Sequence, residues 1–433
     1  MAKFLHVADV HLGFDRYNSK VRTRDFFHTL WDVFERYAVG TAVDFVVIAG
    51  DLFEHRMIQP AILNQAQLCL QQLQTVGIPV IAIEGNHDNC PYGTKTSWLR
   101  YLSDWGLLKL LEPSPGETMY VPWDEATKRG GYIDLECGVR ILGSSWYGAA
   151  APKAIQQIAA AITALPPGPD SQILLFHHGL EGQIARYSGA LRYGELLPLK
   201  AAGIHYLGLG HIHKYYTVDN WVFNPGALEA NNVEEGAFER GALTVEISHG
   251  QVNAQLETDY RQRPIARLSL KLRGQEALEE VEGLALSVID RAIAQKQIIL
   301  EQQPIVELRI EGQVGFDRLE LDTRQLQSLL QDRCNALIFL LKYEVDAVAY
   351  GTPLPADADR HHIEREIFTD LLSANNVYKK LAQPLAAGLI DLKERQLTGE
   401  NEETLYGLVE EMLLPAHGLS AEDPATPAED HSR

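Results

Sequence analysis

The chain has 433 residues, of which 46% are hydrophobic and 22% charged, so it can bury a large core and form two or three domains. Its net charge of −20 argues against a protein that binds polyanions over its whole surface. No apolar stretch reaches about 18 residues and the start lacks a signal-peptide pattern, so we expect neither a membrane span nor export. The four scattered cysteines exclude a cysteine-rich zinc module and indicate a cytoplasmic protein.

The first 260 or so residues alternate apolar runs with helix-like stretches, the pattern of a layered α/β domain. The runs predicted to be strands cover residues 4–8, 45–49, 80–83, 139–142, 173–176, 206–209, 221–223 and 242–247. Apolar side chains at helical spacing predict helices over residues 26–37 and 62–73. The run before residue 84 is apolar throughout, which is typical of a parallel strand buried on both faces.

The character of the sequence changes after Pro264. Two stretches, at 268–272 and 306–311, alternate apolar with polar side chains and predict strands with one wet face. A helical pattern lies between them, and a short helix and a strand at 336–341 complete a small α+β domain. The predicted borders are therefore an α/β domain over 1–260, the α+β domain over 264–350, helices over 356–414 and a disordered tail over 415–433.

Short polar motifs follow five of the predicted strands. They are Asp9-Val10-His11, Gly50-Asp51, Gly85-Asn86-His87-Asp88, His177-His178 and Gly210-His211-Ile212-His213. Functional groups gather beyond the carboxyl ends of the strands in an open α/β sheet, so we expect these side chains to meet. Residues two apart at an extended strand end point to the same side, as Asp9 and His11 would. Any one of these residues alone would more often be an ordinary turn, cap or core residue.

The set of side chains at these strand ends predicts a metal site. It offers two carboxylates, one amide oxygen and four or five imidazoles. This mixture suits Mn²⁺, Fe or Zn²⁺ better than Ca²⁺, which prefers oxygen ligands only. There are too many ligands for one ion, and two ions that share a bridging carboxylate fit better. Whether His177 or His178 is the ligand stays open at this point.

These motifs, in this order, resemble the calcineurin-like metallophosphoesterase superfamily. Residues 9–13 and 50–53, with Asn224-Pro225-Gly226, resemble the SbcD-type DNA repair exonucleases in particular. The resemblance covers residues 1 to about 250 and implies a four-layer β-sandwich flanked by helices. Beyond that, only the order of the parts is similar, and it implies a small α+β cap domain and a C-terminal helical segment that docks on an SbcC-like SMC-type ATPase. The alternative for this helical segment is a subdomain that packs on itself.

The resemblance also implies a role for each site residue. Seven side chains would hold two divalent metal ions, for which Mn²⁺ is expected: Asp9, His11 and His213 one ion, Asn86, His177 and His211 the other, and Asp51 both. His87 would stabilise the transition state or protonate the leaving oxygen, and Asp88 would orient His87. Gly85 would let the backbone turn tightly at the strand end.

The chain departs from the SbcD-type pattern at two positions. Glu54 stands where a histidine thought to orient DNA commonly follows the Gly-Asp-Leu-Phe run, and His55 comes one position later. Ala227 stands where a serine is common after Asn-Pro-Gly. These departures leave hydrolysis intact, but they leave the DNA polarity and the substrate range open.

Three further features have more than one reading. Basic residues that either steer phosphate or belong to a solvated helix start are Arg16, Lys20, Arg22 and Arg24, with Arg56, Lys95, Arg186, Arg192 and Lys214 as weaker candidates. Aromatic and apolar residues that either form a homodimer face or pack into the core are Trp98, Tyr101, Leu102 and Trp105. The run at 93–96 lacks the spacing of a phosphate-binding loop, so any ATP dependence would come from a partner.

The expected function is that of a dinuclear-metal-dependent DNA exonuclease and endonuclease, the nuclease subunit of an SbcCD-like repair complex. One alternative is a metallophosphoesterase that acts on small phosphodiesters. A second is a mainly structural adaptor of a coiled-coil ATPase. The additional C-terminal regions weigh against the first alternative, and the complete ligand set weighs against the second.

Overall fold

The structure, a computed structural model, describes residues 1–433 apart from 115–117, 185–188, 348–359, 374–377, 379–380 and 418–433. The chain divides into two units, of which one comprises residues 1–312 and 319–345 and the other residues 313–318 and 346–433. The predicted border between 260 and 264 falls inside the first unit. The borders at 350 and 356 lie outside the described residues, so the division into domains stays a prediction.

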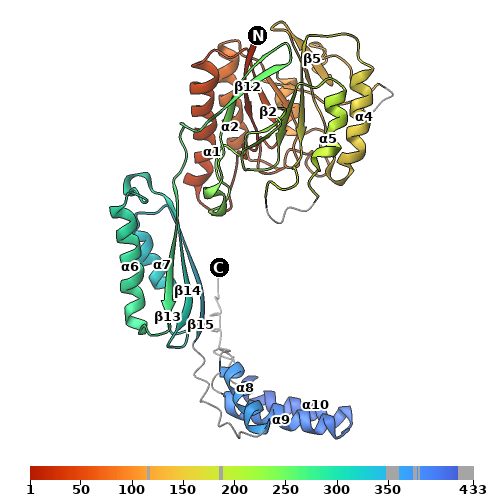
Figure 1. Ribbon diagram of the computed structural model, residues 1–433. Helices are drawn as coiled ribbons and strands as arrows, with labels where there is room; N and C mark the ends of the chain where they lie inside the picture. Colours follow the sequence, from red (N-terminus) through yellow and green to blue (C-terminus); the bar gives the residue numbers. More distant parts are fainter. Residues whose placement is uncertain (115–117, 185–188, 348–359, 374–377, 379–380, 418–433) are drawn as a thin grey trace, which may run out of the picture. The chain divides into compact units, whose positions relative to one another are not determined.

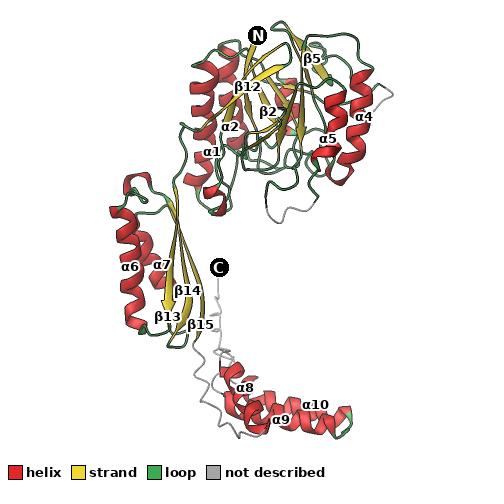
Figure 2. Cartoon of the chain, in the orientation of Figure 1, coloured by secondary structure: helices red, strands yellow, loops and turns green. Residues whose placement is uncertain are grey.

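Two six-stranded sheets form the first part of the chain (Figures 1 and 2). The first sheet has the order β12-β11-β1-β2-β3-β4, with bounds Gln251–Glu257, Ala242–Ser248, Ala2–Val7, Phe45–Ala49, Val80–Ile83 and Lys109–Leu110. The second has the order β5-β6-β7-β8-β10-β9, with bounds Tyr132–Leu135, Val139–Leu142, Ser171–His177, Tyr206–Gly210, Val222–Asn224 and Tyr216–Val218. In each sheet the central strands are parallel, from β1 to β4 and from β6 to β8.

The two sheets pack face to face between helices, as Figure 1 shows. Phe45 and Val47 of β2 contact the second sheet, whereas Val46 and Ile48 contact the helices on the outer face. Those outer helices are α1 (Lys20–Val33), α2 (Pro60–Thr75) and α3 (Trp98–Asp104), and α4 (Ala151–Thr163) and α5 (Tyr193–Ala201) cover the second sheet. Because β2 and β3 are buried on both faces, their sequences are apolar throughout. The predicted four-layer sandwich is confirmed.

All eight strands predicted in the first 260 residues are present. The strands that the sequence patterns missed are β4, β5, β9 and β12. β4 has two residues and β9 has three, and both are too short to show a period. The strand β12 at the sheet edge exposes polar residues on one face, and its other face packs Val252, Ala254 and Leu256 against the core between the sheets.

The later part of the chain follows the predicted order of elements. A three-stranded sheet of β13 (Ile265–Arg273), β14 (Ile305–Val314) and β15 (Ile338–Ala347) carries α6 (Leu278–Ala294) and α7 (Thr323–Cys334). In the second unit lie α8 (Arg360–Ser373), α9 (Ala382–Leu397) and α10 (Glu402–His417). The last of these runs past the predicted start of the tail at 415, and the rest of that tail lies outside the described residues. Within the described ranges, no helix combines the length and apolar character needed to cross a bilayer.

Arg22 belongs to the buried interior and not to a basic surface strip. Its side chain is 1% exposed, and its guanidinium lies 3.3 Å from the Asp25 carboxylate and 3.2 Å from that of Glu229. The guanidinium also stacks over the Phe26 ring at 4.7 Å. The prediction that Arg22 steers phosphate is therefore wrong, because its charge is already neutralised inside the fold.

Arg22→Ala should lower the free energy of unfolding by roughly 3–5 kcal/mol, because it leaves the Glu229 carboxylate buried without its cation. Urea unfolding in the presence of EDTA measures this change. The matched control is Arg24→Ala, two residues along the same helix and exposed, which should change the free energy by less than about 0.5 kcal/mol. Equal effects of the two substitutions would contradict the buried ion-pair assignment.

Candidate metal centre

The predicted ligands come from strand ends in both sheets. The loops after β1, β2 and β3 carry Asp9 and His11, Asp51 and Asn86, whereas the end of β7 and the loop after β8 supply the histidines of the second sheet. The open-sheet argument expected a single edge, but the site forms where the edges of two sheets meet. Two contacts join the sheets there: His177 Nδ1 lies 2.7 Å from the Ala49 carbonyl, and the His211 N–H donates to Asp9 at 2.9 Å.

All seven predicted metal ligands converge at this edge. In two groups, Asp9–His11–His213 and Asp51–His177–His211, the potential ligand atoms lie within 4.8 Å of one another. Asn86 joins the second group, with its Oδ1 2.8 Å from His211 Nδ1 and 3.3 Å from His177 Nε2. Two adjacent clusters of mixed oxygen and nitrogen donors match the chemistry of a dinuclear site.

Several of these residues have an unusual backbone conformation. Asp9, His11 and Asp51 have φ of 51°, 53° and 54°, and His211 has φ of 87°. The sequence argument assumed extended strand ends, so its reason for the shared direction of Asp9 and His11 is wrong. Non-glycine residues are rare in this left-handed region, and they persist where the surroundings hold them at a functional site.

The choice between His177 and His178 follows from their contacts. Both ring nitrogens of His178 face backbone carbonyls, those of Gly179 and Gly148, each at 3.1 Å. In His177, the contact of Nδ1 with the Ala49 carbonyl leaves Nε2 directed at Asp51, 3.1 Å away. His177 is therefore the histidine that faces the cluster.

Asp88 does not orient His87, and this prediction is wrong. The Asp88 carboxylate is buried and accepts hydrogen bonds from the backbone N–H groups of Leu52, Phe53 and Gly85 at 3.1–3.2 Å. These hydrogen bonds thus connect the loop after β3 to the loop after β2. The His87 ring is held instead by the Glu54 carbonyl, 2.6 Å from its Nδ1.

The electrostatics of the clusters fit divalent cations. Burial lowers the pKa of His177, but the Asp51 carboxylate outweighs burial and raises it to about 9, and Glu235 likewise raises the pKa of His213 to about 9. His11 Nε2 and His213 Nε2 lie 3.1 Å apart, where two lone pairs repel unless a proton or a cation lies between them. Metal binding would thus displace protons that otherwise balance the buried carboxylates.

The comparison with known proteins agrees with this geometry. Residues 2–215 match the family model described as calcineurin-like phosphoesterase, and they contain both clusters. This part of the chain belongs to the calcineurin-like phosphoesterase family. The family match ends just after His213, so the regions from β9 onward lie outside it.

Relatives of the calcineurin-like phosphoesterase domain occur in archaea. The DNA double-strand break repair protein Mre11 of Archaeoglobus fulgidus is 31% identical over 54% of this chain and 52% of that protein. The protein of the same name in Sulfolobus acidocaldarius is 24% identical over 76% of this chain and 79% of its own length. A crystal structure of TT1561 of Thermus thermophilus is 11% identical, with a TM-score of 0.37 over 59% of this chain and 98% of that one. This chain thus spans about half the length of the Archaeoglobus fulgidus protein.

Four residues of the phosphoesterase site were given no site role by the sequence analysis. Glu54 and Glu235 lie 2.9 Å and 3.2 Å from the Nδ1 atoms of His11 and His213. The Asn224 side chain donates to the carbonyls on either side of His213, which fixes that loop. The Trp146 ring stacks on His178 and lies against the rings of the ligand candidates His177 and His211. Only Glu54 and Asn224 had a sequence signal, since both lie in or beside a family motif.

The remaining basic candidates differ in their position. Lys20 and Arg24 line a hollow of about 600 Å³ together with His55. Arg56 lies 3.5 Å from the Asn86 carbonyl and stacks on the exposed ring of Tyr92. Candidates that are exposed or partly exposed are Arg16, Lys95, Arg192 and Lys214, and Arg186 lies outside the described residues.

The proposed homodimer face is mostly part of the core. Leu102 is fully buried, and Trp98 and Tyr101 pack against the same hydrophobic cluster. Only Trp105 of this group is largely exposed, with 65% of its surface accessible. The core interpretation is therefore confirmed for Leu102, and dimer formation stays a prediction.

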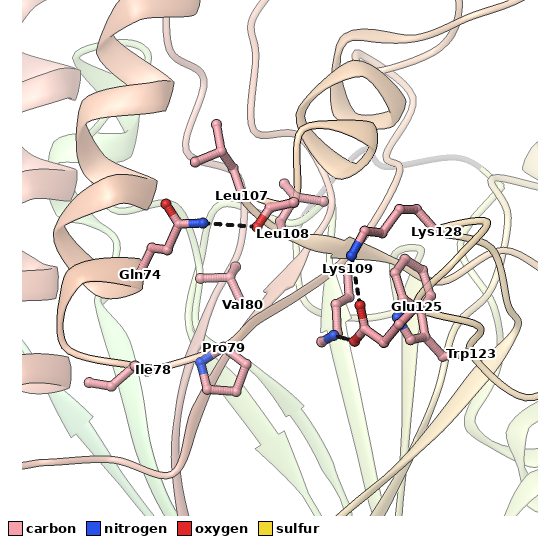
Figure 3. Close-up of a pocket in the computed structure, with 12 residues that line it drawn as sticks. Gln74, Ile78, Pro79, Val80, Leu107, Leu108, Lys109, Trp123, Glu125 and Lys128 are labelled. Atoms are coloured by element: carbon pink, nitrogen blue, oxygen red, sulfur yellow. Dashed lines mark hydrogen bonds and ion pairs between the residues drawn. The ribbon is translucent and has the colours of Figure 1, made fainter.

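A second hollow lies at the opposite end of the first sheet. Figure 3 shows it at the amino ends of β3 and β4, with a volume of about 210 Å³. Lys109 and Lys128 both point to the carboxylate of Glu125, and Lys109 also lies over the Trp123 ring at 5.3 Å. Its two lysines are already paired, and it contains none of the metal-ligand candidates.

Gly85→Ala should disrupt the metal centre, because an added Cβ would lie 2.1 Å from Asp51 Oδ1. The φ of Gly85 is not left-handed, so the close approach of Asp51, and not a tight turn, requires glycine here. We expect a loss of about 1–3 kcal/mol in unfolding free energy and weaker Mn²⁺ binding, measured by urea unfolding and by calorimetric titration.

The matched control is Gly283→Ala within α6, where an added Cβ meets open space. This substitution should stabilise the protein by about 0.5–1 kcal/mol and leave Mn²⁺ binding unchanged. Wild-type metal binding in Gly85→Ala would show that Asp51 is not fixed by this contact.

Proposed function

We propose that this chain is a dinuclear-metal-dependent DNA nuclease with exonuclease and endonuclease activity. The observation that carries the proposal is the convergence of all seven ligand candidates at one edge of the sandwich, with His87 beside them. The family match supports hydrolysis of a phosphoester, and the names of the archaeal relatives support a role in DNA repair.

Each ligand has a proposed place in the centre. Asp9, His11 and His213 would hold one divalent ion, with Mn²⁺ as the expected metal. The second ion would be held by Asn86, His177 and His211. Asp51 would lie between the two ions. Such ions would supply Lewis-acid polarisation of a phosphodiester and activation of a water nucleophile.

His87 is proposed as the proton donor to the leaving oxygen. Its ring lies edge to face against the ring of His11, with the two centroids 5.0 Å apart. Since its Nδ1 faces the Glu54 carbonyl, Nε2 is the nitrogen available to a substrate, and it carries a proton in the imidazolium form. The backbone N–H of His87 donates to Asp51 Oδ1 at 2.8 Å, which fixes the distance between the proton donor and the proposed bridging carboxylate.

The surroundings of the centre support a nucleic-acid substrate. Arg56 contacts the backbone of Asn86, and Lys20 and Arg24 line the hollow that contains Leu12 and His55. Cations in these positions could hold phosphates on both sides of the scissile bond. The net charge of −20 would keep binding elsewhere on the surface weak.

The C-terminal helices are proposed to dock on an SbcC-like SMC-type ATPase. On α8, Ile367 and Leu371 are 51% and 64% exposed and lie one helical turn apart. A helix with such an apolar stripe suits a helix-in-groove contact. The α8 helix belongs to the second unit, outside the residues that match the phosphoesterase family.

Hydrolysis of small phosphodiesters is the second candidate. The same clusters would support hydrolysis of a small phosphodiester, whereas the position of Arg56 beside Asn86 favours DNA as the substrate. A purely structural adaptor is the third candidate. The buried carboxylates and imidazoles weigh against it, because such a set is costly to keep without a ligand.

Incubation with Mn²⁺ and end-labelled single- and double-stranded DNA should give metal-dependent shortening of the strands. Asp51→Ala should abolish cleavage and metal binding together. His87→Ala should retain two Mn²⁺ per chain and lose at least about 100-fold in turnover, the typical size of an acid–base contribution. Bis(p-nitrophenyl) phosphate serves as the small substrate.

Four outcomes would contradict the proposal. No DNA cleavage in the presence of the ATPase, or equal cleavage by Asp51→Ala, would exclude the nuclease. Efficient turnover of the small diester alone would favour the second candidate. Loss of bound metal in His87→Ala would show that this histidine is a ligand and not a proton donor.

The double substitution Ile367→Asp/Leu371→Asp should abolish association with the SMC-type ATPase of the same organism and leave Mn²⁺-dependent nicking within about twofold. Size-exclusion chromatography of the mixed proteins measures association. The control is Leu397→Asp on α9, which is also exposed but lies outside the α8 stripe. If the double variant still binds the ATPase, the docking surface is not on α8.

A further inference from the structure

Glu54 contacts two different histidines of the site through two different groups. Its carboxylate Oε2 lies 2.9 Å from His11 Nδ1, and its backbone carbonyl lies 2.6 Å from His87 Nδ1. Glu54 itself is fixed by a hydrogen bond from its N–H to the Leu12 carbonyl, at 3.0 Å. One residue of the loop after β2 thus lies behind a metal-ligand candidate and behind the proposed proton donor.

The carboxylate contact with His11 is exclusive. Both atoms are buried and lie at ion-pair distance without hydrogen-bond alignment, and within the described part of the chain neither has a hydrogen-bond partner. Each is therefore the charged or polar neighbour that offsets the other's loss of water by electrostatic attraction. The carboxylate favours the tautomer with the proton on the Nδ1 side of the His11 ring, which leaves the unprotonated Nε2 directed at His213, 3.1 Å away.

Glu54 could alternatively be a metal ligand itself, since it forms a third group of possible ligands with His11 and His87. The contact argues against this role. Its carboxylate meets the Nδ1 side of His11, whereas Asp9 and His213 belong to the cluster on the other side of the ring. The carboxylate thus lies behind the ligand and not among the ligands.

We propose that Glu54 is a positioning residue of the metal centre. Its carboxylate fixes the tautomer and the orientation of His11 and makes Nε2 a stronger donor, as carboxylates behind metal-bound histidines do. Its carbonyl sets the position of His87 at the same time. The distance between one metal ion and the leaving-group oxygen would therefore be set by a single residue. This inference deepens the proposed function and rests on it for the role of His87.

The same argument distinguishes the two metal positions. The histidines of the Asp9 group both have carboxylates behind them, Glu54 for His11 and Glu235 for His213. In the other group His177 has a neutral group, the Ala49 carbonyl, and no carboxylate behind its Nδ1. Negative charge behind the ligands strengthens cation binding, so the Asp9 group should bind the first Mn²⁺.

The test is Glu54→Gln, which removes the charge and keeps the size of the side chain and the backbone carbonyl. Calorimetric titration with Mn²⁺ alone should show the first binding step weakened by about 10–100-fold, with the second step changed by less than about threefold. Glu54→Asp restores the charge and should recover part of the lost affinity. Thermal unfolding in EDTA verifies that each variant folds. If Glu54→Gln does not fold, the Mn²⁺ affinity of Glu54→Asp decides on the proposal.

Activity gives a second and separate readout. At saturating Mn²⁺ the turnover of Glu54→Gln should return to within about fivefold of the wild type, because mass action refills the site and the carbonyl still holds His87. A turnover that stays lost at saturating metal would make Glu54 a direct participant in proton transfer, contrary to the proposal. If the wild type cleaves no DNA, the proposed nuclease fails, whereas the Mn²⁺ titration still decides on Glu54.

The matched control is Glu239→Gln, which removes the same charge from an exposed residue of the segment after Glu235. Its first Mn²⁺ should bind within about twofold of the wild-type affinity. Wild-type affinity in Glu54→Gln would overturn the proposal. So would an equal loss in Glu239→Gln, because the effect would then reflect net charge and not the contact with His11.

Discussion

The site depends on one constraint, that the carboxyl ends of the parallel strands of two separate sheets come within hydrogen-bonding distance. The His177 ring reaches across to the Ala49 carbonyl, and the Asp9 carboxylate accepts from the backbone of His211. An added Cβ on Gly210 would lie 2.4 Å from the Ala49 carbonyl, so small residues are needed where the sheets approach. The inter-sheet core of aromatic and branched side chains holds this spacing, and the ligand geometry follows from it.

This arrangement keeps ionisable groups buried that would be costly elsewhere. Asp9, Asp51 and His177 are each at most 2% exposed. Burial raises the pKa of Asp51, but His177 outweighs burial and holds it well below its usual value, so the carboxylate stays charged. The fold supports this charge only because each group has a neighbour of opposite sign or a place for a cation. Backbone hydrogen bonds between the two loops hold the left-handed residues: the N–H of Asp9 donates to the Gly50 carbonyl, and the N–H of His11 donates to the Asp51 carbonyl.

The candidate ligands could be identified from the sequence, because each follows an apolar run long enough to be recognised as a strand. The residues that hold the ligands could not. Glu235 lies 22 positions after His213, and no period or motif connects the two. Asp88 belongs to a recognised motif, yet its carboxylate binds backbone N–H groups, which carry no side-chain pattern. Arg22 resembled a surface cation because its partner Glu229 lies more than 200 residues away.

The charges around the centre determine how a phosphodiester could be attracted. Asp9, Asp51, Glu54 and Glu235 supply four negative charges, which two divalent cations would only balance. A neutral centre polarises a phosphate but does not draw it from solution over long distances. Lys20, Arg24 and Arg56 are then the groups left to supply attraction. If Glu54 acts as proposed, its charge would strengthen metal retention and leave attraction of the substrate to the cations around the site.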